Sequence, residues 1–213
     1  MSGLFLTFEG VEGCGKSSQS SRLLDWLQNE GYSAILTREP GGTPIAESIR
    51  DFLLDTDTQG LDIMAELFLF EAARAQHVSE LLRPAIEGGT IVICDRYVDS
   101  TTAYQSYGRN MPLEEVLTLN HTATAGLAPD ITFLIDLPAE IGLARAKAGA
   151  AGDRMEQESL SFHQRVRDGF LAIADQESHR TRIIDGMEDI DTIFEQIQGI
   201  LTPLLETIPR HGS

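Results

Sequence analysis

A glycine-rich segment follows the first apolar run of the chain and ends in lysine and serine. Residues 10–17 match the pattern G-x-x-x-x-G-K-[ST] in full. Glycines in such a loop let backbone N–H groups surround phosphate oxygens, and the helix that follows adds its positive dipole end. Lys16 is spaced to reach the β- and γ-phosphates, and the Ser17 hydroxyl is a suitable Mg²⁺ ligand. The segment predicts a nucleotide-phosphate site made by Gly10, Val11, Glu12, Gly13, Cys14, Gly15, Lys16, Ser17 and Ser18.

A phosphate loop indicates nucleotide binding and leaves the reaction open. The guanine-reading motif Asn-Lys-x-Asp of GTPases is absent, since the only other lysine, Lys147, lies in Ala-Lys-Ala. A large mechanical ATPase would need a longer chain. The remaining classes are a small phosphotransferase and an ATP-gated binding protein.

A second group of polar residues follows the third apolar run, at Asp95-Arg96-Tyr97. An acid at the carboxyl end of a strand beside the phosphate loop is placed to hold Mg²⁺ or a reacting hydroxyl. The alternative role for Asp95 is to cap the next turn. Arg96 is costly to bury without an anion, and the phosphate of an acceptor would be a suitable partner.

Further candidates are spread over three segments. Phe70 and Arg74 lie four residues apart on one face of an expected helix. They could bind a planar base, with the ring stacking on it and the arginine donating hydrogen bonds. The alternative is a core phenylalanine beside a salt-bridged arginine. Arg38 follows the second expected strand, and Arg50 lies two turns into the next helix. Residues 100–105 add hydroxyls and an amide.

Apolar runs of strand length alternate with stretches of helical period, which is typical of a parallel sheet covered by helices on both faces. Five strands are expected: four at 4–8, 33–37, 90–94 and 131–137, and a fifth whose end lies at 182–185. Helices are expected at 16–30, 43–54, 62–87 with an interruption near Pro84, 100–106, 112–125 starting with Pro at its first position, 139–148, 156–178 and 190–205. The pattern predicts one α/β domain, residues 1–213, with the P-loop NTPase fold.

The segment 146–152 holds four Ala and two Gly around Lys147, with no bulky side chain to anchor it. We expect a short mobile lid over about residues 146–155. The last residues, 210–213, are expected to fray.

Composition limits the partners. The chain of 213 residues carries 33 acidic and 16 basic residues, a net charge of −17, so non-specific nucleic-acid binding is not expected. Fourteen of the basic residues are arginines, which suit phosphates. Cys14 and Cys94 have no CxxC spacing, the N-terminus has no basic leader, and no run approaches 18 apolar residues. We therefore expect no membrane partner, and a location in the cytoplasm.

Several motifs together closely resemble those of bacterial thymidylate kinases, a family of P-loop nucleoside monophosphate kinases: residues 8–17, 37–43, 70–74, 95–97, 100–105 and 153–156. The resemblance covers nearly the whole chain in the same order. It implies transfer of a phosphoryl group from ATP to dTMP, which gives ADP and dTDP on the way to dTTP, with Mg²⁺. It also implies a five-stranded parallel core with a lid, and a homodimer.

The same resemblance implies roles for single residues in the acceptor site. Glu12 matches a carboxylate near the 3′-hydroxyl of dTMP. Arg50 and Arg96 match clamps on its phosphate, Phe70 the ring under thymine, and Arg74 the donor to O4.

Thr101, Tyr104 and Gln105 match a strip beside the base and deoxyribose. Arg38 is assigned to the same acceptor site. Asp95 is a candidate catalytic residue, and Ser17 and Asp95 are the candidate Mg²⁺ ligands.

Positions 11–14 of the phosphate loop carry no basic residue. P-loop enzymes commonly balance the charge on the moving phosphoryl group with an extra arginine. The resemblance implies that a thymidylate kinase without this arginine in the loop carries it in the lid, although Gly149 stands where some members of the family have an arginine. Arg145, Lys147 and Arg154 flank the small-residue segment. We expect Arg154 and at least one of the other two to contact the phosphates when the lid is closed.

Two other functions fit parts of the sequence. A deoxynucleoside kinase would use the phosphate loop, but Arg50 and Arg96 would then lack a phosphate to bind. A nucleotide-sensing regulator would bind ATP without transfer, and Asp95 and a cationic lid would then have no purpose.

Overall fold

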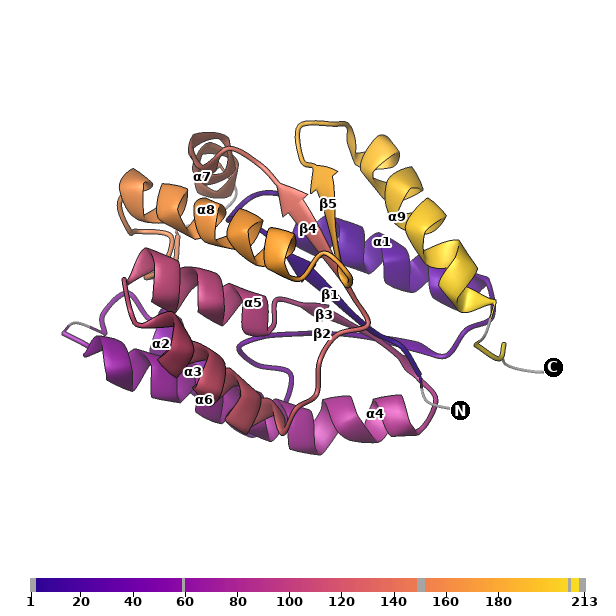
Figure 1. Ribbon diagram of the computed structural model, residues 1–213, viewed down its shortest axis with the longest axis horizontal. Helices are drawn as coiled ribbons and strands as arrows, with labels where there is room; N and C mark the ends of the chain where they lie inside the picture. Colours follow the sequence, from indigo (N-terminus) through magenta and orange to yellow (C-terminus); the bar gives the residue numbers. More distant parts are fainter. Residues whose placement is uncertain (1–2, 59, 149–151, 207, 211–213) are drawn as a thin grey trace.

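The centre of the structure is a five-stranded parallel sheet with strand order β2-β3-β1-β4-β5 (Figure 1). The computed structural model describes residues 3–58, 60–148, 152–206 and 208–210. Its strands are β1 (Phe5–Glu9), β2 (Ala34–Arg38), β3 (Ile91–Asp95), β4 (Ile131–Asp136) and β5 (Thr181–Asp185). The predicted parallel α/β fold is confirmed, with most strands displaced by one residue from the expected bounds.

The helices follow the strands in the expected alternation. They are α1 (Lys16–Asn29), α2 (Pro44–Leu54), α3 (Ile63–His77), the π-helical η1 (Val78–Leu82), α4 (Arg83–Glu87), α5 (Val98–Thr101), the π-helical η2 (Thr102–Gly108), α6 (Leu113–Thr124), α7 (Ala139–Lys147), α8 (Leu160–Gln176) and α9 (Ile190–Leu205). Side-chain caps fix several starts, because Thr43, Asp62, Ser159 and Asp189 each accept a backbone N–H of the first turn.

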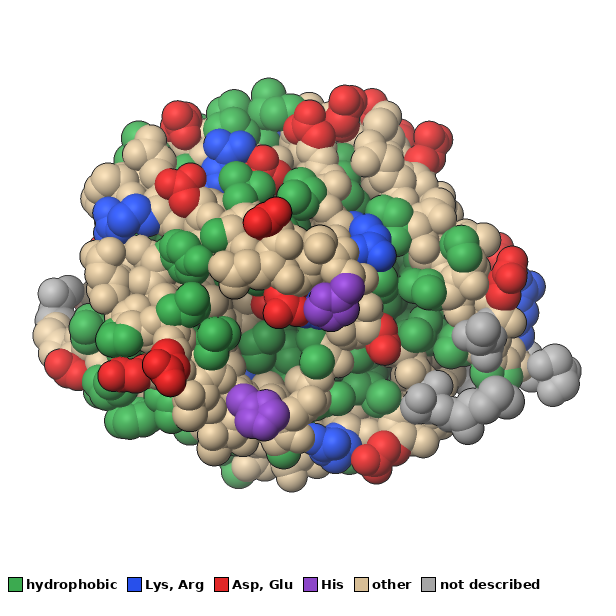
Figure 2. All heavy atoms as spheres, in the orientation of Figure 1, with side chains coloured by type: hydrophobic (Ala, Val, Ile, Leu, Met, Phe, Trp, Pro, Cys, Tyr) green, Lys and Arg blue, Asp and Glu red, His purple; other side chains and the backbone are tan. Residues whose placement is uncertain are grey.

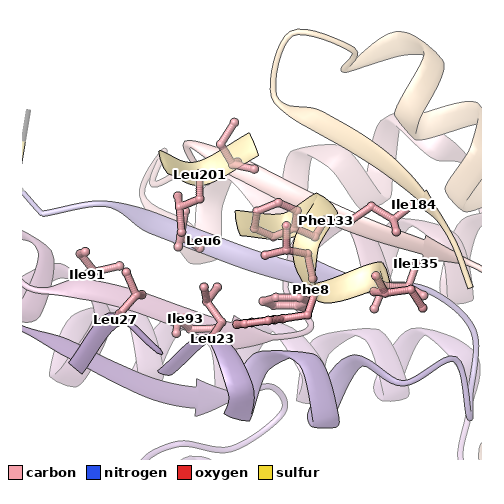
Figure 3. Close-up of a cluster of buried hydrophobic side chains, with 14 of the residues drawn as sticks. Leu6, Phe8, Leu23, Leu27, Ile91, Ile93, Phe133, Ile135, Ile184 and Leu201 are labelled. Atoms are coloured by element: carbon pink, nitrogen blue, oxygen red, sulfur yellow. The ribbon is translucent and has the colours of Figure 1, made fainter. Parts of the chain in front are cut away.

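The two faces of the sheet are covered by different helices because successive strand residues point to opposite sides. Leu6 and Phe8 of β1 pack on α1 and α9 through Leu23, Leu27 and Leu201 (Figure 3). On the opposite face, aromatic and aliphatic residues from η1, α5, η2 and α8 pack on β1, β3 and β4. This core holds the carboxyl ends of the strands at one edge.

Several expected helix bounds differ from the structure, and the helix expected over 100–106 extends over α5 and η2, from Val98 to Gly108. The helix expected from 156 begins at Leu160, since Asp153 first accepts the N–H groups of Met155 and Glu156 in a separate turn. Pro112 is the N-cap of α6 and not its first residue.

The interruption expected near Pro84 lies earlier. Because Pro84 has no N–H, the preceding turn widens to the π-helical η1, and the chain stays helical to Glu87. Residues 149–151 of the expected lid, Gly149 among them, and 211–213 of the expected frayed end lie outside the described residues.

Helix α7 lies directly against the phosphate loop. A Cβ on Gly142 would stand 2.2 Å from the carbonyl oxygen of Glu12, and a Cβ on Gly13 would stand 2.2 Å from that of Gly142. Gly13 also has a φ of 65°, which a glycine adopts without strain. The two glycines therefore let α7 hold the loop in its curved form.

Acidic residues outnumber basic ones in the chain, 33 to 16. On the face shown in Figure 2, Asp and Glu side chains are spread over the molecule and Lys and Arg are fewer. Within the described part of the chain, no helix combines the length and apolar character needed to cross a bilayer.

Candidate active site

A cavity of about 480 Å³ opens at the carboxyl ends of β1, β2 and β3. This edge is where open α/β sheets bind ligands. The cavity brings together most of the residues predicted from the sequence: Glu12, Gly13, Gly15, Lys16, Ser17, Ser18, Arg38, Arg50, Phe70, Arg74, Asp95, Arg96, Thr101, Tyr104, Gln105 and Arg145. Segments up to 133 residues apart in sequence thus meet in one place.

The phosphate loop joins β1 to α1. Gly15 is the N-cap of α1 with a left-handed backbone, so the first N–H groups of the helix face the loop. The Lys16 ammonium donates to the carbonyl oxygens of Gly10, at 3.2 Å, and Val11, at 2.9 Å, and lies 3.6 Å from Cys14 Sγ. The loop therefore presents one cation and several N–H groups.

Ser17 and Asp95 meet across the edge of the sheet. The Ser17 hydroxyl donates to Asp95 Oδ2 at 2.5 Å, which joins the start of α1 to the end of β3. A hydroxyl and a carboxylate oxygen this close are a donor set that suits Mg²⁺, which keeps several water ligands of its own.

Arg96 is held in place by its backbone and by several side chains. Its backbone is left-handed, with φ 72°, and its N–H donates to Phe8 O at 3.0 Å. Its guanidinium donates to Glu12 Oε1 at 2.7 Å and to the Ser100 hydroxyl at 3.0 Å. The Tyr104 hydroxyl also donates to Glu12, at 2.7 Å. Glu12 thus fixes the Arg96 guanidinium in the cavity, and the Glu12 carboxylate lines the same cavity.

Glu12 and Arg96 stabilise each other's charge. Burial alone would favour the neutral carboxyl, yet Arg96 and Lys16 lower the pKa of Glu12 to about 2. Burial likewise opposes the charge on Arg96, and the Glu12 carboxylate outweighs it and raises the pKa of the guanidinium. Both groups are therefore ionised at neutral pH.

Glu9, the last residue of β1, supports this arrangement from below. It is 1% exposed and accepts the Tyr97 N–H at 2.7 Å and the Ser100 hydroxyl at 2.6 Å. Burial and the nearby Asp99 carboxylate raise the pKa of Glu9 to about 8. The sequence analysis did not identify Glu9, although an acid that ends a buried strand just before a phosphate loop is a usable signal.

A cationic corner lies beside α2. The Arg50 guanidinium donates to Pro40 O at 2.8 Å, and Arg38 pairs with Glu47 at 3.0 Å. Burial and the positive charges of Arg38 and Arg96 lower the pKa of Arg50. Three arginines that repel one another around one cavity make a favourable place for an anion.

Arg74 is 3% exposed and donates to four side chains. Nε donates to Glu39 at 2.8 Å, Nη1 to Glu71 at 2.9 Å and Asn120 at 2.8 Å, and Nη2 to Thr101 at 2.9 Å. A guanidinium has five N–H groups, so these bonds leave one on Nη2. Phe70, one helical turn earlier on α3, lines the same cavity.

The three lid cations lie in different places. Arg145 lines the cavity and donates to Gly186 O at 3.4 Å. Lys147 is exposed at the end of α7. Arg154 pairs with Glu66 at 2.6 Å and donates to Leu53 O at 2.8 Å.

Comparisons with known proteins agree with this geometry. The family model described as thymidylate kinase matches residues 8–197. The chain is 48% identical over 196 residues to the thymidylate kinase of Geotalea daltonii, covering 89% of this chain and 92% of that protein. It is 48% identical over 209 residues to that of Desulfovibrio desulfuricans, covering 95% and 96%. The crystal structure of thymidylate kinase from Ehrlichia chaffeensis matches with a TM-score of 0.77 at 35% identity, over 94% of this chain and 99% of that one.

The raised pKa of Glu9 predicts a pH dependence of stability. The ordinary value is 4.5 and the folded value is about 8, so between them the unfolded chain ionises Glu9 while the folded chain keeps its proton. The contribution of Glu9 is fully present below 4.5 and is lost as the pH rises through about 8. We expect Glu9→Gln to flatten the fall in the free energy of unfolding over this range, measured by urea denaturation.

Glu87→Gln, at an exposed site, is the control. An unchanged pH slope in Glu9→Gln would contradict this assignment.

Proposed function

The chain belongs to the thymidylate kinase family, and we propose that it phosphorylates dTMP to dTDP by direct in-line transfer of the γ-phosphoryl group of MgATP. The observation that carries this proposal is the presence of two separate cationic groups in one cavity. Lys16 and the phosphate loop form the first, and Arg50 and Arg96 form the second. A donor and an acceptor that are both phosphorylated need two such groups.

The acceptor oxygen belongs to a phosphate, and this simplifies the chemistry. A phosphate monoester is largely a dianion at neutral pH, so its attacking oxygen carries no proton that a base must remove. The residues of the site then have to align the two phosphates and balance their charge. Arg50 and Arg96 would hold the acceptor phosphate, while Lys16 would hold the donor.

Ser17 and Asp95 would hold the Mg²⁺ ion. When bound, the ion neutralises charge on the donor phosphates. Glu12 accepts from Arg96 at 2.7 Å, so it would hold that guanidinium in place, and it would approach the 3′-hydroxyl of dTMP.

The thymine base would lie against Phe70. The remaining N–H of Arg74 would donate to O4, and Thr101, Tyr104 and Gln105 would line the base and sugar. Arg38, at the open side of the same cavity, would add positive charge near the acceptor phosphate.

We propose that Arg145 supplies the extra cation for the moving phosphoryl group, since it lines the cavity. Arg154 stays a proposed phosphate contact of a closed lid, and that role requires its ion pair with Glu66 to open. Lys147 would reach the phosphates only through a movement of the segment that follows α7.

We also propose a homodimer in which helices α2, α3 and α6 form the contact. Large apolar side chains are exposed there on neighbouring helices, namely Ile45, Phe52, Ile63, Phe68 and Leu117. Residues 1–213 would act as one kinase domain. The two free thiols, Cys14 and Cys94, support a reducing compartment such as the cytoplasm.

The test of the proposed function is a coupled assay of ADP release with MgATP and a panel of acceptors. We expect turnover with dTMP to exceed that with dUMP, AMP, CMP and thymidine, because only dTMP combines the phosphate and the methylated base. Turnover with thymidine above that with dTMP would favour a deoxynucleoside kinase. Binding of ATP with no acceptor-dependent ADP release would favour a nucleotide sensor.

The lid proposal predicts a separation between two nearby cations. Arg145→Ala should lower kcat by about 10³-fold with little change in KM for ATP, since its contact would strengthen as charge develops on the moving group. Lys147→Ala is the matched control, two residues away on the same helix, and should stay within about threefold of the unmodified chain. Steady-state kinetics of both variants measure this. A kcat for Arg145→Ala within that same range would exclude Arg145 as the acting cation.

A further inference from the structure

Glu66 lies in the first turn of α3, behind the wall of the cavity, and is 1% exposed. Its carboxylate meets Gln105 of η2, Arg109 at the end of η2, and Arg154 of the segment after α7. We infer that Glu66 is a specificity-determining residue, because it fixes the Gln105 amide so that the carbonyl oxygen faces the acceptor base. This inference rests on the proposed function and extends it to how the base is selected.

The hydrogen bonds to Glu66 use both oxygens completely. Oε1 accepts from Gln105 Nε2 at 3.1 Å and from Arg109 Nε at 3.1 Å. Oε2 accepts from Arg109 Nη2 at 3.3 Å and forms an ion pair with Arg154 Nη1 at 2.6 Å. An ionised carboxylate offers about four acceptor sites, so no site is left for another donor.

The two arginines keep Glu66 charged. Burial alone would raise the pKa of Glu66, but hydrogen bonds and charge from Arg109, and a hydrogen bond from Arg154, lower it. An ionised carboxylate can only accept hydrogen bonds. Gln105 must therefore turn its NH₂ group, and not its carbonyl oxygen, toward Glu66.

The other end of the Gln105 amide faces the cavity. Gln105 lines the cavity and is 1% exposed. Among the described residues, the Gln105 side chain forms one hydrogen bond, from Nε2 to Glu66. With Nε2 bonded to Glu66, Oε1 is the amide atom that remains to accept a hydrogen bond from a ligand in the cavity.

Gln105 and Arg74 then present a defined pattern beside Phe70. Gln105 offers an acceptor, and Arg74 offers its remaining N–H as a donor. Thymine carries an N3–H donor next to the O4 acceptor, so it fits both groups. A cytosine base carries an N3 acceptor next to an amino donor, so it opposes both and leaves buried polar groups unpaired. The pattern selects a 4-oxo pyrimidine over a 4-amino pyrimidine.

The test compares dTMP with 5-methyl-dCMP, which keeps the methyl group, sugar and phosphate and changes only positions 3 and 4. Glu66→Gln gives residue 66 an amide that both donates and accepts, so Gln105 is free to turn over. We expect the preference for dTMP, as a ratio of kcat/KM and of dissociation constants by calorimetry, to fall by about tenfold or more. A change that only loosened the structure would weaken both ligands alike and leave the ratio unchanged.

Glu158→Gln is the matched control. Glu158 is bonded to Arg109 from the side away from Glu66, and no bond joins it to Gln105 in the described structure. Glu158→Gln also removes one negative charge that pairs with Arg109, and the preference for dTMP over 5-methyl-dCMP should stay within about threefold of that of the unmodified chain. An unchanged ratio in Glu66→Gln, or an equal fall in both variants, would overturn the inference.

Gln105→Glu tests the same geometry if Glu66→Gln does not fold. A carboxyl beside ionised Glu66 must keep a proton on the facing oxygen, so its other oxygen still accepts from N3–H. The dissociation constant for dTMP should then rise with pH more steeply than in the unmodified chain, as the second carboxyl loses its proton. Equal pH slopes would overturn the inference. Calorimetry needs no turnover, so a chain that binds dTMP with this selectivity but does not phosphorylate it would refute the proposed function alone.

Discussion

Two guanidinium groups, those of Arg74 and Arg96, lie inside the protein at the carboxyl edge of the sheet, and each is stable there because carboxylates surround it. Arg74 is bonded to Glu39 and Glu71, and Arg96 to Glu12. An unpaired charge at such depth is strongly unfavourable, and removal of one partner of a buried pair costs about 3–5 kcal/mol. The positions of these carboxylates therefore constrain the turns after β1, β2 and β3.

The same pairing reconciles an acidic protein with an anionic ligand. The net charge is −17, and acidic side chains are widespread on the surface in Figure 2, yet Arg38, Arg50 and Arg96 converge on one cavity. A phosphate that enters this corner replaces repulsion among arginines with charge-assisted hydrogen bonds. Glu12 holds Arg96 in place beforehand, so little of the binding free energy is spent on ordering that side chain.

The sequence predicted the features that depend on local pattern. The phosphate loop and the parallel sheet follow from motif spacing and from the alternation of strands and helices, and the resemblance to thymidylate kinases added the cavity residues of the acceptor site. Glu39 and Glu66 could not be found in this way. A single carboxylate on a strand or helix has the same pattern whether it faces water or a buried arginine, and only the fold brings its partner to it. Arg154 illustrates the converse, because sequence spacing suggested phosphates as its partner and the structure gives it Glu66.

The central claim is that Arg50 and Arg96 are arranged for the phosphate of the acceptor. The most direct measurement is calorimetric titration of the unmodified chain with dTMP and with thymidine, in the absence of ATP. Each charged hydrogen bond to the phosphate is worth about 1.5–3 kcal/mol, so two arginines predict that thymidine binds at least about 100-fold more weakly than dTMP. Dissociation constants that agree within about threefold would show that the phosphate is not what these arginines bind, and would contradict the account.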